Sequence, residues 1–152
     1  MSPTVPLGPG PEVISLTVFV RNGLSSIYSA TSQAAFDKAF SDFFHNDAKI
    51  TVNGKHLTLA QYKQQLQGEK FLEQSSQVSI LNSVEVTTGR VGLIETGSVG
   101  IYYKVQLYER LLFMGAPVES ILNSSLNAQV TAEGNVVKVS ALDEVAFDQV
   151  PR

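Results

Sequence analysis

Apolar residues in the first part of the chain recur at the spacing of a helix. Between residues 13 and 28 they stand three or four positions apart, which puts one apolar stripe on a helix: Val13, Leu16, Val20, Leu24, Ile27 and Tyr28. The start of this segment is rich in residues branched at Cβ, which favour strands. The pattern therefore predicts a helix from about residue 13, with a strand as the alternative for its beginning.

A second helix is predicted after Ser32, a residue that can cap a helix N-terminus. Its apolar stripe is aromatic and consists of Phe36, Phe40, Phe43 and Phe44. Because these rings fall on one side of a helix, we expect them to face a core.

A short strand and a third helix should follow. The strand over residues 48–52 ends at Asn53-Gly54, a pair typical of tight turns. Thr58 and Gln61 form a capping box that predicts a helix over residues 59–67, ended by Gly68.

The second half of the chain has the period of strands. Apolar and polar residues alternate from about residue 77 onward, with an interruption at residues 88–90 and a restart at Gly97. Residues 101, 103, 105 and 107 form a dry face of one long strand. Two more strands, over residues 118–132 and 136–145, are joined by a link that contains Gly134.

Helices first and long strands afterwards indicate an α+β domain. We expect the N-terminal helices to pack on one face of a strongly curved antiparallel sheet of four to six strands. A hollow between them would be the default ligand site. Residues 1–11 are rich in proline and glycine and are read as a flexible leader, so the domain is placed at residues 12–150.

Two stretches of the sequence resemble a known superfamily. Residues 40–54, FSDFFHNDAKITVNG, and residues 57–66, LTLAQYKQQL, are similar to the helix, Asp-Ala, strand, Gly and helix passage of nuclear transport factor 2-like proteins, in their SnoaL-like branch. The resemblance implies a cone-shaped α+β barrel with a deep pocket, commonly dimeric through its sheet. The superfamily includes cyclases, dehydratases, isomerases, epoxide hydrolases and non-catalytic binding modules, so the fold does not choose the function.

The first helical segment departs from that superfamily, whose first helix is single and long. Here Asn22-Gly23 and the serines between residues 25 and 32 are candidate interruptions. The sequence leaves the topology of the first forty residues open.

His45 and Asp47 are the candidate catalytic residues. A histidine two positions from a carboxylate could form an oriented acid and base in a pocket. In the alternative interpretation, Asn46 and Asp47 cap the turn between helix and strand and His45 is solvated.

A second group of residues is predicted to line a ligand pocket. Tyr28, Tyr62 and Tyr103 fall on apolar stripes, so their hydroxyls need partners and could orient a ligand. Phe40 and Phe44 belong to the aromatic stripe. The carboxylate with the most apolar neighbours in sequence is Glu95, which is either a useful acid or the end of a strand. The tyrosines are equally compatible with a core in which their hydroxyls are bonded.

Composition narrows the classes of function. The net charge of −3 lacks the basic excess that nucleic-acid binding requires. The chain has no cysteine, and its two histidines lack the spacing of a metal motif. We therefore expect no metal, no cofactor and no nucleic-acid partner. With no apolar run long enough to span a membrane and no signal peptide, a cytoplasmic location is expected.

Three functions are compatible with this sequence. The first is a homodimer, formed through the sheet, that binds a small apolar molecule in the cone. The second is a lyase, isomerase or cyclase without a cofactor. The third is a module that binds another protein through the wet face of one strand, which carries Tyr102, Lys104, Gln106, Tyr108 and Arg110.

Overall fold

The computed structural model describes residues 12–69, 75–113 and 116–149 of the 152-residue chain. Within these ranges the helices are α1 (Leu16–Ser29), α2 (Gln33–Phe43) and α3 (Leu59–Glu69). The strands are β1 (Phe44–Val52), β2 (Lys55–Leu57), β3 (Ser75–Val91), β4 (Ile94–Phe113), β5 (Ala116–Glu133) and β6 (Val136–Gln149). None of the described helices is long and apolar enough to cross a membrane.

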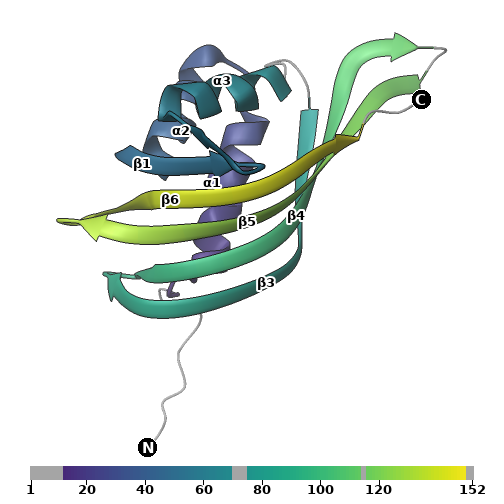
Figure 1. Cartoon of the computed structure of the whole chain (residues 1–152). Coiled ribbons are helices and arrows are strands. Elements are labelled where there is room, and N and C mark those ends of the chain that lie inside the picture. The colour runs from purple at the N-terminus through teal and green to yellow at the C-terminus, as the bar shows by residue number, and fades with distance from the viewer. Residues whose placement is uncertain (1–11, 70–74, 114–115, 150–152) are drawn as a thin grey trace, which may run out of the picture.

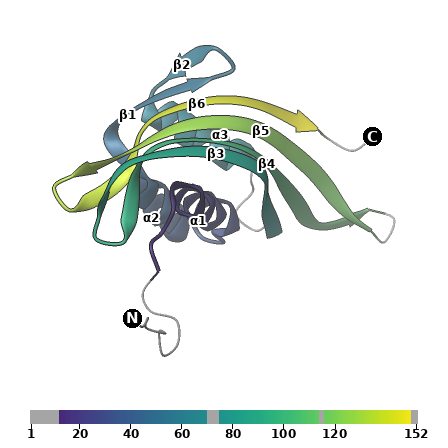
Figure 2. The same ribbon diagram turned by 90° about the horizontal axis from the view of Figure 1, so that it is seen from below.

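The strands form one curved sheet in the order β2-β1-β6-β5-β4-β3. The sheet arches over α1 and α2, and none of the described helices lies on the opposite, outer face of its long strands (Figures 1 and 2). This arrangement confirms the predicted α+β class. The sheet is mixed rather than antiparallel, because β1 pairs with β6 in parallel. It also stays open, since β2 and β3 are unjoined edges, so the expected barrel does not close.

Asn53, just after β1, links β1 to β6 through hydrogen bonds. Its backbone N–H donates to the Glu144 carbonyl at 2.8 Å. Its side-chain amide then donates to the Ala146 carbonyl at 3.1 Å and accepts from the Ala146 N–H at 2.9 Å. The residue has φ +51, a conformation that asparagine tolerates better than most residues. The predicted Asn-Gly turn thus also holds β6 beside β1.

The first segment is a helix preceded by an isolated bridge, so the strand expected as the alternative for its beginning does not form. Ile14 forms a parallel bridge with Ile94 of β4, and α1 begins only at Leu16. The Ser15 side chain caps the helix by accepting from the Val18 N–H at 3.2 Å. The helix continues through Gly23 and the serines after it, and the break before α2 comes at Ala30.

Gly23 lets α1 and α2 approach closely. A Cβ placed on this residue would lie 2.1 Å from Cδ1 of Phe43, which is buried in the core. We therefore expect Gly23→Ala to lower the free energy of unfolding by about 1–3 kcal/mol, because overpacking outweighs the gain in helix propensity. Chemical denaturation measures this change. Ser26→Ala, at an exposed position of α1, is the control. Unchanged or increased stability of Gly23→Ala would contradict the close approach.

The third helix and the long hairpin follow the prediction in part. In the capping box, Gln61 Oε1 accepts from the Thr58 N–H at 2.9 Å and Thr58 Oγ1 accepts from the Gln61 N–H at 3.1 Å. The helix passes Gly68 and ends at Glu69. The predicted interruption at residues 88–90 is a bulge, and the strand reverses at Gly92, where φ is +59.

The core lies between the helices and the inner face of the sheet. The predicted dry face of β4 is buried and consists of Ile101, Tyr103, Val105 and Leu107. On the opposite face Tyr102 is 45% exposed. The predicted two-sided character of this strand is therefore confirmed, although the side chain of Arg110 lies outside the described residues.

Candidate functional site

A carboxylate surrounded by hydroxyl groups lies inside the core. Glu144 of β6 is only 2% exposed. Its Oε1 accepts from the Tyr62 hydroxyl at 2.7 Å, and its Oε2 accepts from the Tyr103 hydroxyl at 2.6 Å. The Ser124 hydroxyl also donates to Oε2. We call these four residues, all buried, the Glu144 cluster.

Four elements position this cluster. Tyr103 of β4 and Ser124 of β5 face each other directly in the antiparallel register. Glu144 lies two positions before Ala146, which is the partner of Ser124 on β6. Residues two apart on a strand point to the same side, so all three reach the inner face. Tyr62 comes from α3, whose capping box fixes where the helix begins.

The cluster holds a hydrogen-bonded carboxyl group in the core. Three hydroxyls lie within hydrogen-bond distance of the two carboxyl oxygens, so all of the polar atoms in the cluster have a partner. Among the ion pairs of the described residues, none involves Glu144. Within the described residues, the side-chain partners of Glu144 are therefore neutral hydroxyl groups.

Tyr62 keeps its proton in this environment. Burial of the phenol, followed by the nearby charge of Glu144, raises the pKa of Tyr62 well above its usual value of 10. Ionised Tyr103 and Tyr28 would add to this effect. The Tyr62 hydroxyl is consequently a lasting hydrogen-bond donor to Glu144.

The predicted pocket residues pack against one another. The ring of Phe44 lies 4.8 Å from Phe40 and 5.8 Å from Tyr62, centroid to centroid. Tyr28 is fully buried as well. The structure thus brings Phe40, Phe44, Tyr62 and Tyr103 to one side of the sheet, with the two tyrosine hydroxyls on a single carboxylate.

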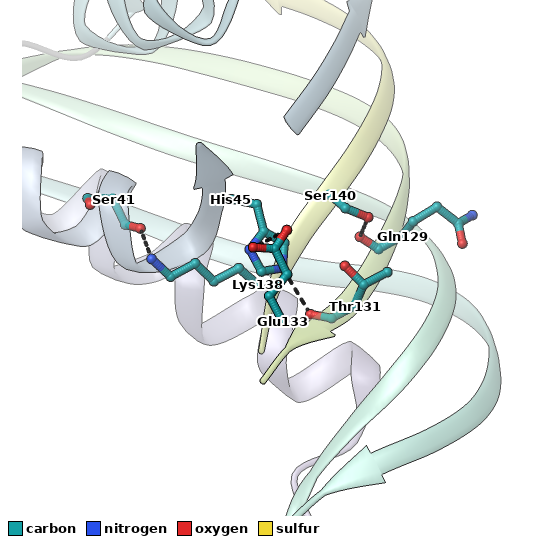
Figure 3. Close-up of polar contacts among 7 residues, drawn as sticks. All are labelled: Ser41, His45, Gln129, Thr131, Glu133, Lys138 and Ser140. Carbon is teal, nitrogen blue, oxygen red and sulfur yellow. Dashed lines mark hydrogen bonds and ion pairs between the residues drawn. The ribbon is translucent and has the colours of Figure 1, made fainter. Parts of the chain in front are cut away.

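His45 lies at a different place in the fold. It is 4% exposed, and its Nε2 is 3.0 Å from the Thr131 carbonyl, to which it donates (Figure 3). Its Nδ1 is 3.8 Å from Oε1 of Glu133, an exposed residue next to the β5–β6 turn. Phe44, the neighbour of His45, pairs with Val139, five residues before Glu144. At about 3.3 Å per residue of strand, the backbone of His45 is roughly 15 Å from that of Glu144.

Asp47 is exposed on β1. Among the ion pairs of the described residues, the carboxylate beside His45 is that of Glu133 and not that of Asp47. Catalysis by His45 with Asp47 stays a prediction, and the geometry gives His45 a role in fastening β1 to the β5–β6 hairpin.

Glu95 stands near the start of β4, eight residues before Tyr103. Its side chain is half-buried and accepts from the Thr87 hydroxyl at 3.2 Å. The structure therefore does not bring it to the Glu144 cluster. No group of three or more metal-ligating side chains converges within the described ranges.

Sequence reasoning missed Glu144, although a signal for it was present. The segment 136–145 alternates, and Glu144 shares its side with Leu142, which is buried. A carboxylate on the apolar side of a strand needs donors. The sequence also placed Tyr62 and Tyr103 on apolar stripes, where their hydroxyls could be those donors.

Comparisons with known proteins identify the fold. No family model matches the sequence, and the search of curated proteins found no match. Among solved structures, one similar chain belongs to the Mtr2–Mex67 M domain complex of C. albicans, with 15% identity and a TM-score of 0.60. The match covers 90% of this chain and 96% of that one.

Two further structures have the same architecture. LinA is 12% identical with a TM-score of 0.55, covering 89% of this chain and 88% of its own. AusH from Aspergillus nidulans is 11% identical with a TM-score of 0.54, covering 87% of this chain and 83% of its own. At these identities the likeness concerns the fold and leaves the activity open.

Proposed function

We propose that this chain, which has the nuclear transport factor 2-like fold, functions as a homodimer assembled through the outer face of its sheet. The carrying observation is a set of apolar side chains on that face that are exposed in the single chain. They are Val84 (73% exposed), Phe147 (67%), Val145 (65%), Val86 (62%) and Tyr102 (45%). Large apolar side chains gathered on one face are typical of interaction sites.

The register aligns several of these residues across the strands. Tyr102 of β4 pairs with Ser125 of β5, which pairs with Val145 of β6. In the next row, Asn123 of β5 pairs with Phe147. Tyrosine and phenylalanine are enriched in protein interfaces. We call this surface of β3 to β6 the outer face.

The charges of the outer face favour a second copy of the same chain as the partner. Along the stretch of β4, β5 and β6 where Tyr102, Val145 and Phe147 stand, the described charged side chains at outward positions are Lys104 and Asp143. In a two-fold dimer, the same patch meets itself, so a strongly charged face would repel its copy. One positive and one negative group permit self-association.

The packing inside the fold supports assembly over the binding of a small apolar molecule in the cone. The rings of Phe40, Phe44 and Tyr62 contact each other, and all three side chains are buried. Their apolar surface is already used by the core. One of the similar structures is a complex of two proteins, which supports assembly and makes a different protein partner the alternative occupant.

Val145→Asp tests this function. The substitution puts a second negative charge beside Asp143 in the middle of the outer face, where it would be desolvated in the dimer. We expect the dimer to dissociate, with a Kd at least about 30-fold higher. Sedimentation equilibrium measures the association constant.

Leu93→Asp is the matched control, because Leu93 is also exposed but lies in the β3–β4 turn. We expect this variant to dimerise like the unaltered chain. Equal Kd values for Val145→Asp and the unaltered chain would rule out the outer face. A monomeric unaltered chain would reject the homodimer and leave the different partner as the alternative.

A further inference from the structure

We propose that Asn53 is a deamidation site, which the native fold protects and which opening of the β1–β2 hairpin exposes. Asn53 and Gly54 are the two turn residues of this hairpin, because Val52 pairs with Lys55. The hairpin stands at the edge of the sheet, and both turn residues are exposed to water (Figure 2). Asparagine is a thermolabile residue, and a following glycine puts no side chain beside the nitrogen that attacks it. The inference goes beyond the proposed homodimer and does not depend on it.

The reaction needs only water as a co-reactant. The Gly54 backbone nitrogen loses its proton and bonds to Cγ of Asn53, while the side-chain amide takes up a proton and leaves as ammonia. The product is a cyclic imide. Water then adds to one of its two carbonyl carbons and opens the ring. The result is an aspartate or, by opening at the other carbonyl, an isoaspartate whose backbone contains the side-chain methylene.

Hydrogen bonds to β6 hold the Asn53 amide away from this reaction. Its Nδ2 donates to the Ala146 carbonyl at 3.1 Å, and its Oδ1 accepts from the Ala146 N–H at 2.9 Å. Both ends of the amide are thus fixed to the main chain of β6, whereas attack requires the amide to turn its face toward the Gly54 nitrogen. Two bonds of ordinary net strength reduce the population of the free amide about tenfold.

Deamidation would weaken the link between β1 and β6 permanently. An aspartate can still accept from the Ala146 N–H, but its second oxygen replaces a donor and faces the Ala146 carbonyl oxygen. An isoaspartate also lengthens a two-residue turn, and turn length sets the register of a hairpin. Either product should therefore speed amide hydrogen exchange in β1 and β2.

The chain contains a second Asn-Gly pair, which serves as an internal control. Asn22-Gly23 lies inside α1, where backbone N–H groups are used in helix bonds, and Gly23 packs against the Phe43 ring. Its protection does not involve β6. In the unfolded chain the two pairs have the same local chemistry, so we expect them to deamidate at comparable rates.

The first experiment follows both sites in the full chain at mildly alkaline pH, in native buffer and in denaturing guanidinium chloride. Peptide mapping by mass spectrometry measures aspartate and isoaspartate at positions 53 and 22. We expect Asn53 to deamidate at least about tenfold more slowly in the native chain than in the denatured one. Equal rates at Asn53 under the two conditions would overturn the proposal.

Ala146→Pro assigns the protection to the bonds with β6. Proline lacks the N–H that Asn53 accepts, and that N–H is bonded to Asn53 rather than to β5. In the native variant we expect deamidation of Asn53 to be about threefold faster, with Asn22 unchanged. An unchanged rate at Asn53, or equal acceleration at both sites, would overturn the proposal.

Asn53→Asp decides the case if Ala146→Pro does not fold. This variant carries the aspartate that deamidation produces and keeps the length of the turn. We expect amide hydrogen exchange to be faster in β1 and β2 than in the unaltered chain, with exchange in α1 unchanged. Unchanged exchange in β1 and β2 would overturn the proposal, because the amide would then not hold the hairpin to β6.

Discussion

Replacing Glu144 by leucine should lower the free energy of unfolding by about 3 kcal/mol. The substitution removes the carboxyl group to which the hydroxyls of Tyr62, Tyr103 and Ser124 donate in the core. An unsatisfied buried polar group costs about 1–3 kcal/mol, and part of this cost is recovered where hydroxyls bond to one another. Chemical denaturation at one fixed protein concentration measures the loss, because the stability of a dimer depends on concentration.

A double-mutant cycle separates the hydrogen bond from general disruption. Tyr62→Phe removes the donor to Oε1 and should cost about 2 kcal/mol alone. Combined with Glu144→Leu, it should cost less than the sum of the two by about 1 kcal/mol, because the double variant has one unpaired hydroxyl fewer. Additive losses would contradict the direct interaction of Tyr62 with Glu144.

The second large effect is expected at Phe44. Its ring contacts those of Phe40, Phe43 and Tyr62 at centroid distances of 4.8, 4.9 and 5.8 Å. Truncation to alanine leaves a cavity that these rings cannot fill, so the free energy of unfolding should fall by about 3–5 kcal/mol. Thermal or chemical unfolding measures this loss.

A comparison with Phe147→Ala shows whether the aromatic side chains on the inner face form a packed core or line an open pocket. Phe147 is 67% exposed on the outer face, so its truncation should change the stability of the isolated chain by no more than about 0.5 kcal/mol at concentrations below the Kd of the dimer. A lining residue of an open pocket would behave more like Phe147 than like a core residue. A loss at Phe44 below about 1 kcal/mol would therefore favour the predicted pocket over the packed core.

Local signals in the sequence predicted most of the elements. The capping box at Thr58 placed the start of α3, and the alternation after residue 100 assigned Tyr102 and Tyr103 to opposite faces of β4. Hydrogen bonds of a cap and the period of a strand depend on residues close in sequence, so they can be read without the fold.

The misjudged features depend on contacts between distant segments. From the sequence, Gly23 looks like a helix breaker, but in the fold it makes room for the Phe43 ring. Gly97 looks like the start of a strand, but in the fold it lies inside β4, close to the Val86 carbonyl. The parallel pairing of β1 with β6 joins residues about ninety positions apart. No local pattern specifies such a pairing.

In the candidate site, too, the features set by local sequence were predicted and those set by distant contacts were not. Burial of Tyr62 and Tyr103 followed from their positions on apolar stripes, but their common acceptor lies on another strand. His45 and Asp47 are close in sequence, yet the bulged path of β1 buries one and exposes the other. Proximity along a strand was a poor guide to shared chemistry here.

Sedimentation equilibrium of the unaltered chain tests the central claim most directly. A homodimer formed through the outer face predicts that the average mass rises with concentration from 16.5 kDa toward twice that value. Because a stable interface buries about 800 Å² on each partner, the outer face would have to be largely covered in the dimer. A mass that stays at 16.5 kDa from low to high micromolar concentration would contradict the homodimer.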